Sequence, residues 1–453
     1  MRKLFIATAI VAVVFVLAGS LQAQDLKELG KKLNAAMQQE DWSTVCSVTK
    51  ELGALNTEKA VKIIFQIALQ IERKDVYDAA KEALESITDE EALDFMCEQA
   101  RKNKTWEVRL MLAEVLSKKE GDNIFQTLLD MLKDKKDEVV REAVLALRTR
   151  GDHKAVDALI EVLGKIEKGK GLLWVEVRRA LTALTGADYD TAENWEGYWR
   201  IRKDELKAGP KSPDTAKPAL KGEPRTSIDD EVKKAPKFFG QEVMSRKILF
   251  VIDRSGSMQA RDPVYKKDEG GQLKPTTPPK DPKNLDPWGG DPTLPLDRAR
   301  IERVKKELCK CIAGMDPKTK FNVLYFSSNI AQWQKKLVYA NSQSKNSAIK
   351  WVKGLGPMGA THTDEALKKA FADEEFDTLF LLSDGQPFRN SAMVPVDPIL
   401  EWVRNANRQR KVKIFTFGFE NVRTTQSVNR EEMLKLLQGL AREHNGKFTN
   451  IYW

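Results

Sequence analysis

The spacing of apolar residues divides the chain into two halves with different periods. Between residues 24 and 206, apolar side chains recur every three or four positions, and no proline interrupts the pattern. From residue 238 onward, short continuous apolar runs alternate with amphipathic stretches. A period of three to four residues predicts helices, whereas short apolar runs rich in β-branched and aromatic residues predict buried strands. We therefore expect an all-helical half followed by a half of alternating strands and helices.

The helical half contains internal repeats. The Val-Arg pairs at 108–109, 140–141 and 177–178 each open a helix that continues with small and large apolar residues. The first two pairs are 32 positions apart and the last two are 37 apart, and the helices between them keep the same offset. Such a period is typical of an α-solenoid, in which helix pairs bury their apolar faces by stacking on their neighbours.

Residues 24–206 resemble HEAT-type helical repeats, most clearly at 137–163. The resemblance implies an all-α solenoid domain. Trp195, Tyr198 and Trp199 are predicted to close this array as a hydrophobic cap. Solenoids commonly present a binding surface, and both a ligand-binding role and a purely packing role for this one stay open.

Residues 1–23 have the pattern of an export signal. Arg2 and Lys3 supply positive charge, residues 4–17 form an apolar run, and the segment 21–23 (Leu-Gln-Ala) is a candidate cleavage site. The apolar run is shorter than the roughly 20 residues of a membrane-spanning helix. We expect an exported protein, periplasmic or extracellular, with an uncleaved N-terminal anchor as the alternative.

Residues 207–237 have the composition of a linker. This segment is rich in proline and lysine and holds almost no large apolar residue. It cannot bury enough apolar surface to offset the entropy lost on ordering, so we expect an extended or disordered tether between two domains.

The half from residue 238 to 453 alternates predicted strands with predicted helices. The strands are expected at 248–252, 321–326, 378–382, 412–419 and 447–452, with edge strands at 238–243 and 332–339. The helices are expected at 297–315, 347–352, 363–371, 397–405 and 430–443. This alternation predicts a mainly parallel, doubly wound, Rossmann-like α/β sheet with helices on both faces. Ligands bind such sheets beyond the carboxyl ends of the strands.

Oxygen-bearing side chains follow two of the predicted strands. The first central strand is followed by Asp253, Ser255 and Ser257, and another strand leads into Asp384. Thr361 lies in a glycine-containing turn just before a helix. Two carboxylates and three hydroxyls form an all-oxygen set of low charge, which suits Mg²⁺, with Mn²⁺ as a substitute. The alternative is that these side chains only cap helices or bond to local backbone.

These five residues match a known site in sequence order. Asp253-x-Ser255-x-Ser257, Thr361 and Asp384 correspond one by one to the metal-ion-dependent adhesion site of the von Willebrand factor type A family, which the C-terminal half resembles. The resemblance implies that the first four side chains bind Mg²⁺ directly or through water and that Asp384 holds a metal-bound water. It also implies an open coordination position for an Asp or Glu side chain of a partner protein.

An insert at residues 259–296 departs from the family pattern. It carries eight prolines and separates the serines from the first helix, which in the family usually follows them closely. Long loops in compact domains are usually functional or disordered. We expect the insert to contribute to the recognition surface with Tyr265 and Trp288 as anchors, or to shield the metal through Asp262 or Asp286.

Composition and the remaining motifs exclude several functions. The net charge of +9 over 453 residues comes from interspersed charges and argues against nucleic-acid binding. The four cysteines show neither disulfide-framework nor metal-ligand spacing, and three histidines give no case for zinc. Ser255 is not in a Gly-x-Ser-x-Gly elbow, so we expect no catalytic residues and no enzyme.

The sequence therefore favours an exported protein that uses Mg²⁺ to bind an acidic residue of a protein partner, with no integral membrane domain beyond the signal segment. The alternative hypothesis is a scaffold of an envelope-associated assembly. In that case the helical array makes the main contacts and the metal is structural.

Overall fold

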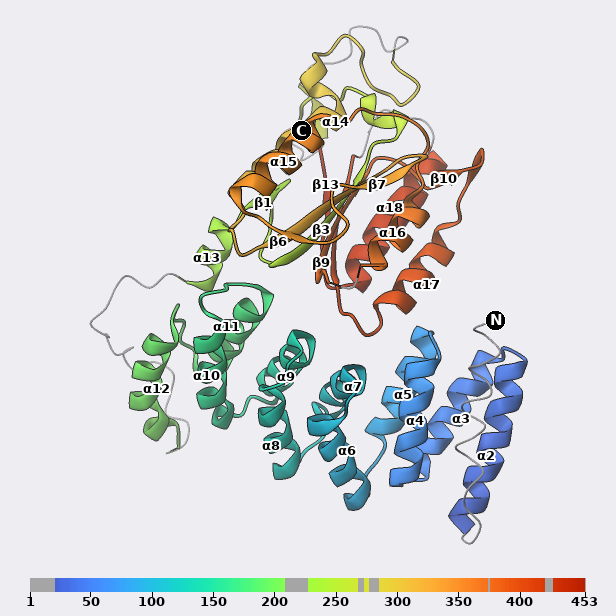
Figure 1. Ribbon diagram of the computed structural model, residues 1–453, viewed down its shortest axis with the longest axis vertical. Coiled ribbons are helices and arrows are strands. Elements are labelled where there is room, and N and C mark those ends of the chain that lie inside the picture. Colours follow the sequence, from blue (N-terminus) through green and yellow to red (C-terminus); the bar gives the residue numbers. More distant parts are fainter. Residues whose placement is uncertain are drawn as a thin grey trace. The chain divides into compact units, whose positions relative to one another are not determined.

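The structure is a computed structural model, and the residues that it describes are 21–207, 227–267, 273–276, 285–373, 375–419 and 427–452. The chain separates into two compact units, with the boundary between Ile228 and Asp229 (Figure 1). The predicted signal lies outside the described residues except for 21–23, which belong to the helix α2. Within the described ranges, no helix combines the length and the apolar character needed to cross a membrane.

The described part of the first unit is helical, as the periodicity predicts. Its helices are α2 (Leu21–Gln38), α3 (Trp42–Ala54), α4 (Glu58–Gln70), α5 (Lys74–Glu85), α6 (Glu90–Lys102), α7 (Trp106–Leu116), α8 (Asp122–Met131), α9 (Asp137–Arg150), α10 (Val156–Ile166), α11 (Leu172–Thr185) and α12 (Ala192–Lys207). Asp41, Thr57 and Asp89 cap α3, α4 and α6 by accepting a hydrogen bond from a first-turn amide. Gly151 and Gly186, both at positive φ, end α9 and α11.

The repeated Val-Arg pairs lie near the start of alternate helices in this array. Val108 and Val140 lie in the first turns of α7 and α9, Val177 lies in the second turn of α11, and all three are buried. Arg141 extends from α9 to Glu176 of α11, where its Nε donates to Oε2 at 2.9 Å within a buried ion pair. The repeat therefore reflects one structural unit that is used several times.

The aromatic cap predicted at the end of the array is confirmed. Trp195, Tyr198 and Trp199 are all buried. The Trp195 Nε1 donates to the Tyr189 carbonyl at 2.9 Å, and the two rings meet edge to face. These aromatic side chains are packed within the unit, which favours the packing role over an exposed aromatic patch.

The linker prediction is partly wrong. Most of the segment 207–237 lies outside the described residues, but α13 (Ile228–Lys234) is a short helix within it. Ile228 is buried, and its amide donates to Asp188 Oδ2 at 2.6 Å. A stretch whose composition predicts a tether therefore contains a short helix with one buried apolar side chain and one hydrogen bond to a residue 40 positions away.

The second unit is a doubly wound α/β domain. Its main sheet has the order β13-β12-β9-β3-β6-β7, with β8 also paired to β6. The strands are β3 (Lys247–Asp253), β6 (Lys320–Phe326), β7 (Ile330–Gln332), β8 (Val338–Tyr339), β9 (Thr378–Ser383), β12 (Lys413–Gly418) and β13 (Phe448–Asn450). The pairs along β13-β12-β9-β3-β6 are parallel, whereas β7 and β8 run antiparallel to β6.

Helices cover both faces of this sheet (Figure 1). The helices α14 (Arg300–Gly314) and α15 (Ser342–Lys353) pack on one face, and α16 (Thr363–Phe371), α17 (Val396–Asn407) and α18 (Ser427–Glu443) pack on the other. Along β3, Phe250 belongs to the first core and Val251 to the second. Burial on both faces explains the continuous apolar run of this strand, and the predicted fold class is confirmed.

Two predicted edge strands are different in the structure. The segment 238–243 does not join the main sheet but forms a separate hairpin, β1 (Lys237–Phe238) with β2 (Gln241–Glu242). Phe239 and Gly240 take positive φ at its turn, and Phe238 packs edge to face on Phe250. The segment 332–339 is not one strand, because only its ends pair with β6, as parts of β7 and β8.

Candidate metal centre

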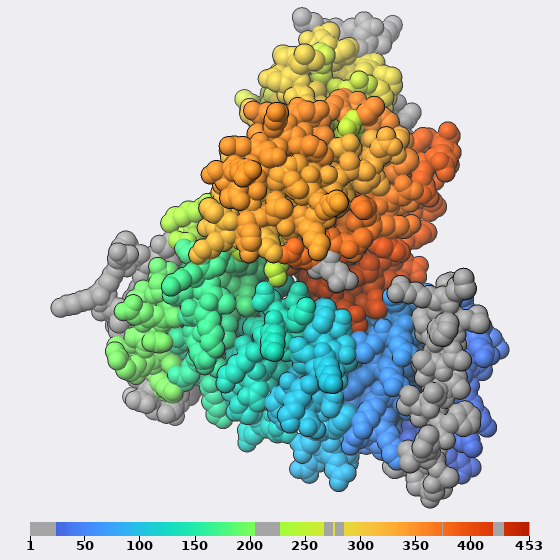
Figure 2. Space-filling model, in the orientation of Figure 1, coloured from blue at the N-terminus to red at the C-terminus, as the bar shows by residue number. Residues whose placement is uncertain are grey.

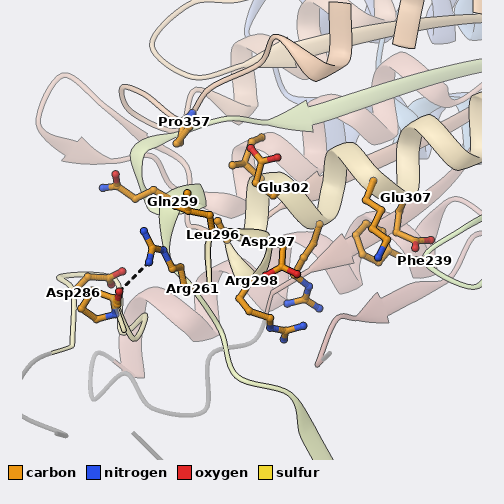
Figure 3. A pocket seen from close by; sticks show the side chains of 15 residues that line it. Phe239, Gln259, Arg261, Asp286, Leu296, Asp297, Arg298, Glu302, Glu307 and Pro357 are labelled. Atoms are coloured by element: carbon orange, nitrogen blue, oxygen red, sulfur yellow. Dashed lines mark hydrogen bonds between the residues drawn. The ribbon is translucent and has the colours of Figure 1, made fainter. Parts of the chain in front are cut away.

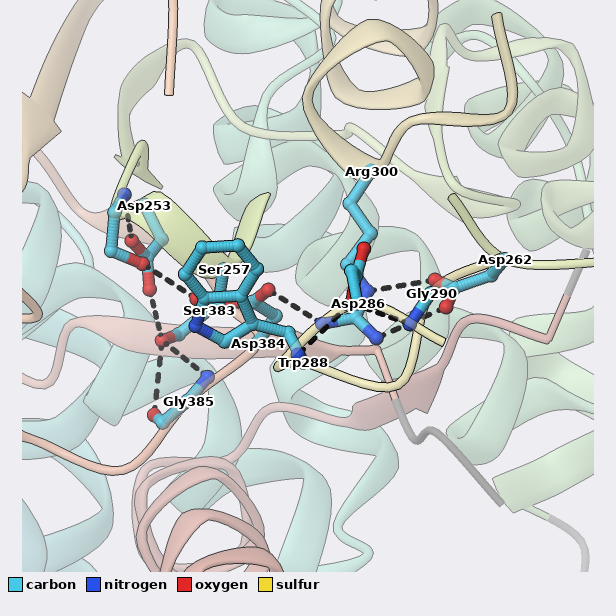
Figure 4. Close-up of polar contacts among 11 residues, drawn as sticks. Asp253, Ser257, Asp262, Asp286, Trp288, Gly290, Arg300, Ser383, Asp384 and Gly385 are labelled. Atoms are coloured by element: carbon cyan, nitrogen blue, oxygen red, sulfur yellow. Dashed lines mark hydrogen bonds and ion pairs between the residues drawn. The ribbon is translucent and has the colours of Figure 1, made fainter. Parts of the chain in front are cut away.

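Two carboxylates lie at neighbouring strand ends. The strands β3 and β9 are adjacent and parallel, with Ile252 opposite Leu382. Asp253 is the last residue of β3, and Asp384 follows β9 directly. Because parallel strands end at the same edge of a sheet, the two acidic side chains meet there, as Figure 4 shows.

Asp253 is fully buried and both of its carboxylate oxygens accept hydrogen bonds. Oδ1 accepts from the Ser255 amide at 2.7 Å, and Oδ2 accepts from Ser383 Oγ at 2.6 Å (Figure 4). Burial and the nearby charge of Asp384 raise the pKa of Asp253 to about 7. A positive charge placed close by would oppose both causes and favour the ionised carboxylate.

A short chain of hydrogen bonds connects the motif serines to Asp384. The Oγ atoms of Ser255 and Ser257 are 2.9 Å apart, and Ser257 Oγ donates to Asp384 Oδ1 at 2.7 Å. All three residues line one pocket with a volume of about 440 Å³. The motif therefore presents two hydroxyls and one carboxylate to the same space, with Asp253 buried beside Ser255.

Thr361 reaches this pocket on a separate loop. The Gly256 amide donates to the Gly359 carbonyl at 2.9 Å and so joins this loop to the serine motif. Gly359 has a φ of 76°, and a Cβ there would lie 2.6 Å from Ser328 Oγ, so glycine is required for both reasons. The backbone of Thr361 exchanges two hydrogen bonds with Phe388, and its side chain lines the pocket. Four of the five predicted residues thus surround one space.

Arg300, which the sequence analysis does not single out, connects the site to the insert. It is the first residue of α14 and is 3% exposed. Its Nη1 donates to Asp384 Oδ2 at 2.8 Å, while its Nε and Nη2 donate to the two oxygens of Asp262 at 2.7 and 3.0 Å. Burial lowers the pKa of Arg300, but the attraction of the two carboxylates outweighs this and leaves the pKa raised. The only sequence signal was an arginine four positions after the end of the insert.

The insert closes on itself at its base. Arg261 forms an antiparallel β-bridge with Ala299, and its carbonyl accepts a hydrogen bond from the Asp291 amide at 2.9 Å. The Arg300 amide donates to the Ala260 carbonyl at 3.0 Å. The described part of the insert, yellow-green to yellow in Figure 2, forms one end of the second unit. It includes a small hairpin of β4 (Tyr265–Lys267) and β5 (Leu273–Pro275).

One of the two predicted anchors of the insert lines the pocket beside the serine motif. Asp286 Oδ1 accepts hydrogen bonds from the amides of Trp288 and Gly290 at 2.9 and 2.7 Å, and the resulting turn brings Trp288 to the pocket. The prediction for Tyr265 is wrong, because its side chain is only 8% exposed. Asp262 and Asp286, the alternatives for shielding the metal, do not line this pocket.

The chemistry of these donors fits a hard cation such as Mg²⁺. Hydroxyl and carboxylate oxygens are the ligands that Mg²⁺ prefers, and it keeps several waters that a pocket of this size accommodates. The described residues hold no group of three or more His, Cys, Asp or Glu placed to bind a metal, and all four cysteines are free thiols. Both oxygens of Asp384 already accept hydrogen bonds, one from Ser257 and one from Arg300. This suits a role in which Asp384 contacts the cation through water.

Family models match both halves of the chain. Residues 297–449 match the model described as von Willebrand factor type A domain, and residues 30–117 and 97–168 match the model of HEAT repeats. The first match begins directly after the insert. It includes Thr361 and Asp384 and leaves the serine motif outside.

Curated relatives match part of this chain at low identity. The human von Willebrand factor A domain-containing protein 3B is 28% identical over 123 residues, which cover 27% of this chain and 9% of that protein. Its human counterpart 3A is 32% identical over 120 residues, covering 26% and 10%. The human inter-alpha-trypsin inhibitor heavy chain H4 is 22% identical over 160 residues, covering 33% and 13%. The chain thus spans about a tenth of the length of these relatives.

Solved structures match a larger share of this chain at lower identity. A von Willebrand factor type A protein from Catenulispora acidiphila is 16% identical, with a TM-score of 0.31, over 46% of this chain and 39% of that one. The PilB minor pilin from Streptococcus sanguinis is 12% identical, with a TM-score of 0.30, over 47% of this chain and 58% of that one.

Proposed function

We propose, from the premise that the chain joins HEAT repeats to a von Willebrand factor type A domain, that it is an exported, non-enzymatic interaction protein. It binds a partner protein through a divalent cation, Mg²⁺ or Mn²⁺, held by Ser255, Ser257 and Thr361, with Asp253 and Asp384 acting in support. The observation that carries this proposal is the convergence of three hydroxyls and the carboxylate of Asp384 from three loops on one open pocket.

The side chains around the pocket have distinct tasks in this mechanism. The three hydroxyls supply neutral oxygen ligands, so a bound cation keeps most of its positive charge. Asp253 is buried and positioned by the Ser255 amide and Ser383, which orients the serine loop. Asp384 is held by Arg300 and Ser257 and so supplies charge from a fixed place. A bound Mg²⁺ would act as a Lewis acid for a carboxylate of the partner.

Apolar side chains around the pocket supply a second contact area. Trp288, Phe388 and Met393 line it, and Phe388 and Met393 are 40% and 48% exposed. Large exposed apolar side chains beside a polar centre are typical of interaction sites. We expect the partner to offer an Asp or Glu next to large apolar residues.

Calorimetry on the full chain tests the cation. We expect Mg²⁺ and Mn²⁺ to bind at one site and Asp253→Ala to abolish this binding while the circular dichroism spectrum stays unchanged. The control is Asp397→Ala, which removes an exposed carboxylate on α17 that pairs with Lys435, and it should bind like the parent. If neither cation binds the parent chain, the proposed mechanism is wrong.

A second candidate function assigns the main contacts to the helical array. A pocket of about 450 Å³ lies against α3 and α5, lined by Lys50, Asn56, Glu82 and Thr88 among others. Under this hypothesis, partner capture from envelope extracts would survive EDTA and Asp253→Ala. Under the main proposal both treatments would release the partner, so a pull-down with and without chelator distinguishes the two.

A further inference from the structure

A second and larger pocket on the second unit is lined by other residues than the pocket at the serine motif. It has a volume of about 890 Å³ and is formed by the base of the insert, the first turns of α14, and Phe239 (Figure 3). No residue lines both pockets. A volume in this range is typical of sites for small molecules or for a side chain of a larger ligand.

Arg303 is the unusual residue of this pocket. It is 7% exposed, and neither Nη1 nor Nη2 has a hydrogen-bond partner among the described residues. The guanidinium lies 5.0 Å from the centre of the Phe419 ring, which stabilises the cation from one face but accepts none of its in-plane N–H groups. A buried charged donor without an acceptor is unfavourable and needs an explanation.

Arg298 presents a second donor of the same kind to this pocket. Its Nε donates to the Asp262 carbonyl at 2.9 Å, whereas its Nη2 is buried and has no partner within the described part of the chain. Burial, and then the like charge of Arg298, lower the pKa of Arg303 to about 10. Arg303 is therefore still cationic at neutral pH, and Arg298 stands close enough for its like charge to act on Arg303.

Four carboxylates also line the pocket, but none of them accepts a hydrogen bond from the unpartnered nitrogens of Arg303. Asp286 accepts from two backbone amides of its own turn, and Glu302 pairs with Lys305 at 2.7 Å. Asp297 and Glu307 also line the pocket, yet neither accepts a hydrogen bond from Arg303. The first turn of α14 faces the same space, where the helix dipole favours negative charge.

We propose that this pocket binds an oxyanion, a phosphate or carboxylate group, that accepts hydrogen bonds from Arg303 and Arg298. The planar donor pairs of arginine match the two oxygens of such a group. The anion would accept hydrogen bonds from three buried guanidinium nitrogens, Nη1 and Nη2 of Arg303 and Nη2 of Arg298, and would offset the repulsion between the two side chains. This site goes beyond the proposed cation-dependent binding and does not require it.

The test is thermal unfolding of the full chain in EDTA, titrated with inorganic phosphate or succinate at constant ionic strength set with chloride. We expect saturable stabilisation by at least one anion. Arg303→Met should weaken the apparent affinity roughly tenfold or more, the loss of one charge-assisted pair. Lys310→Met removes an exposed cation from the same helix outside the pocket and should leave the affinity within about twofold.

Comparing the two anions shows which chemical class of ligand the pocket prefers. A preference for phosphate identifies a phosphorylated ligand, and a preference for succinate identifies a carboxylate. If neither anion stabilises the chain saturably, or if Arg303→Met and the parent respond alike, the proposal is wrong. Arg303→Lys keeps the charge without the fork and replaces the methionine variant if that variant does not fold; it should show the same loss.

Discussion

Replacing Arg300 by methionine tests whether the buried ion pairs at the start of α14 hold the metal centre together. Methionine fills much of the same space but removes all three hydrogen bonds to Asp262 and Asp384. The side chain of Asp384 is 0% exposed and that of Asp262 is 10% exposed. Both carboxylates would remain buried without a cation.

The expected loss of stability is large. Removing one partner from a buried ion pair costs about 3–5 kcal/mol, since the remaining charge loses its compensation. A typical domain has a total stability of about 5–15 kcal/mol. The variant should therefore fold but open far more often. We further expect Mg²⁺ to recover part of the loss, because the centre is more negative in the variant than in the parent.

Hydrogen exchange read out by mass spectrometry measures this effect separately for each unit of the chain. The amides of β3 and β9 report opening of the second unit, and those of α9 serve as an internal reference. Arg389→Met is the matched control, since this arginine pairs with Glu365 at the surface and is 35% exposed. Its loss should cost no more than about 1 kcal/mol. If Arg300→Met costs as little as the control, the ion pairs do not support the site.

Two other perturbations probe the same region. In EDTA the stability of the second unit should fall as pH rises from about 4 to about 7. In this range folded Asp253, whose pKa is raised from 3.8 to about 7, keeps a proton that the unfolded chain releases. Asp253→Asn should therefore reduce the difference in stability that urea unfolding measures between about pH 5 and about pH 8, and an unchanged difference would contradict the raised pKa of Asp253. Gly290→Ala should displace the turn that carries Trp288, since its Cβ would lie 2.4 Å from Asp286 Oδ2, so partner affinity should drop roughly tenfold or more while Mg²⁺ affinity in calorimetry stays unchanged. Gly356→Ala, where a Cβ meets nothing within 4 Å, is the control and should bind the partner normally.

The parts of the structure that follow from local pattern could be predicted from the sequence. The continuous apolar run of β3 requires burial on both faces, and residues directly after such a strand must lie at the carboxyl edge of the sheet. Asp253 and Asp384 were placed in this way, each from its own strand. The helical repeats were equally visible, because each unit repeats the same local arrangement of apolar residues.

The parts that depend on distant partners could not be predicted. Arg300 bonds to residues 38 and 84 positions away, and nothing in its neighbouring sequence specifies either contact. Trp288 reaches the pocket only because Asp286 fixes a tight turn around it. The hairpin at Phe238 also escaped prediction, since two-residue strands have no periodicity to detect and its turn places Phe239 at a φ of 45°.

The closed base of the insert separates the length of this loop from the integrity of the fold. The bridge between Arg261 and Ala299 brings the two ends of the insert together, so the entropy of loop closure is set mainly at that point. Lengthening a loop beyond such a clasp costs only about 0.6 kcal/mol for each doubling. Provided that Asp262 keeps its ion pair with Arg300, the rest of the segment beyond the clasp can therefore be exchanged or extended while the sheet and the oxygen donors stay in place. The insert is a position at which binding specificity can diversify, and at which foreign sequences can be grafted.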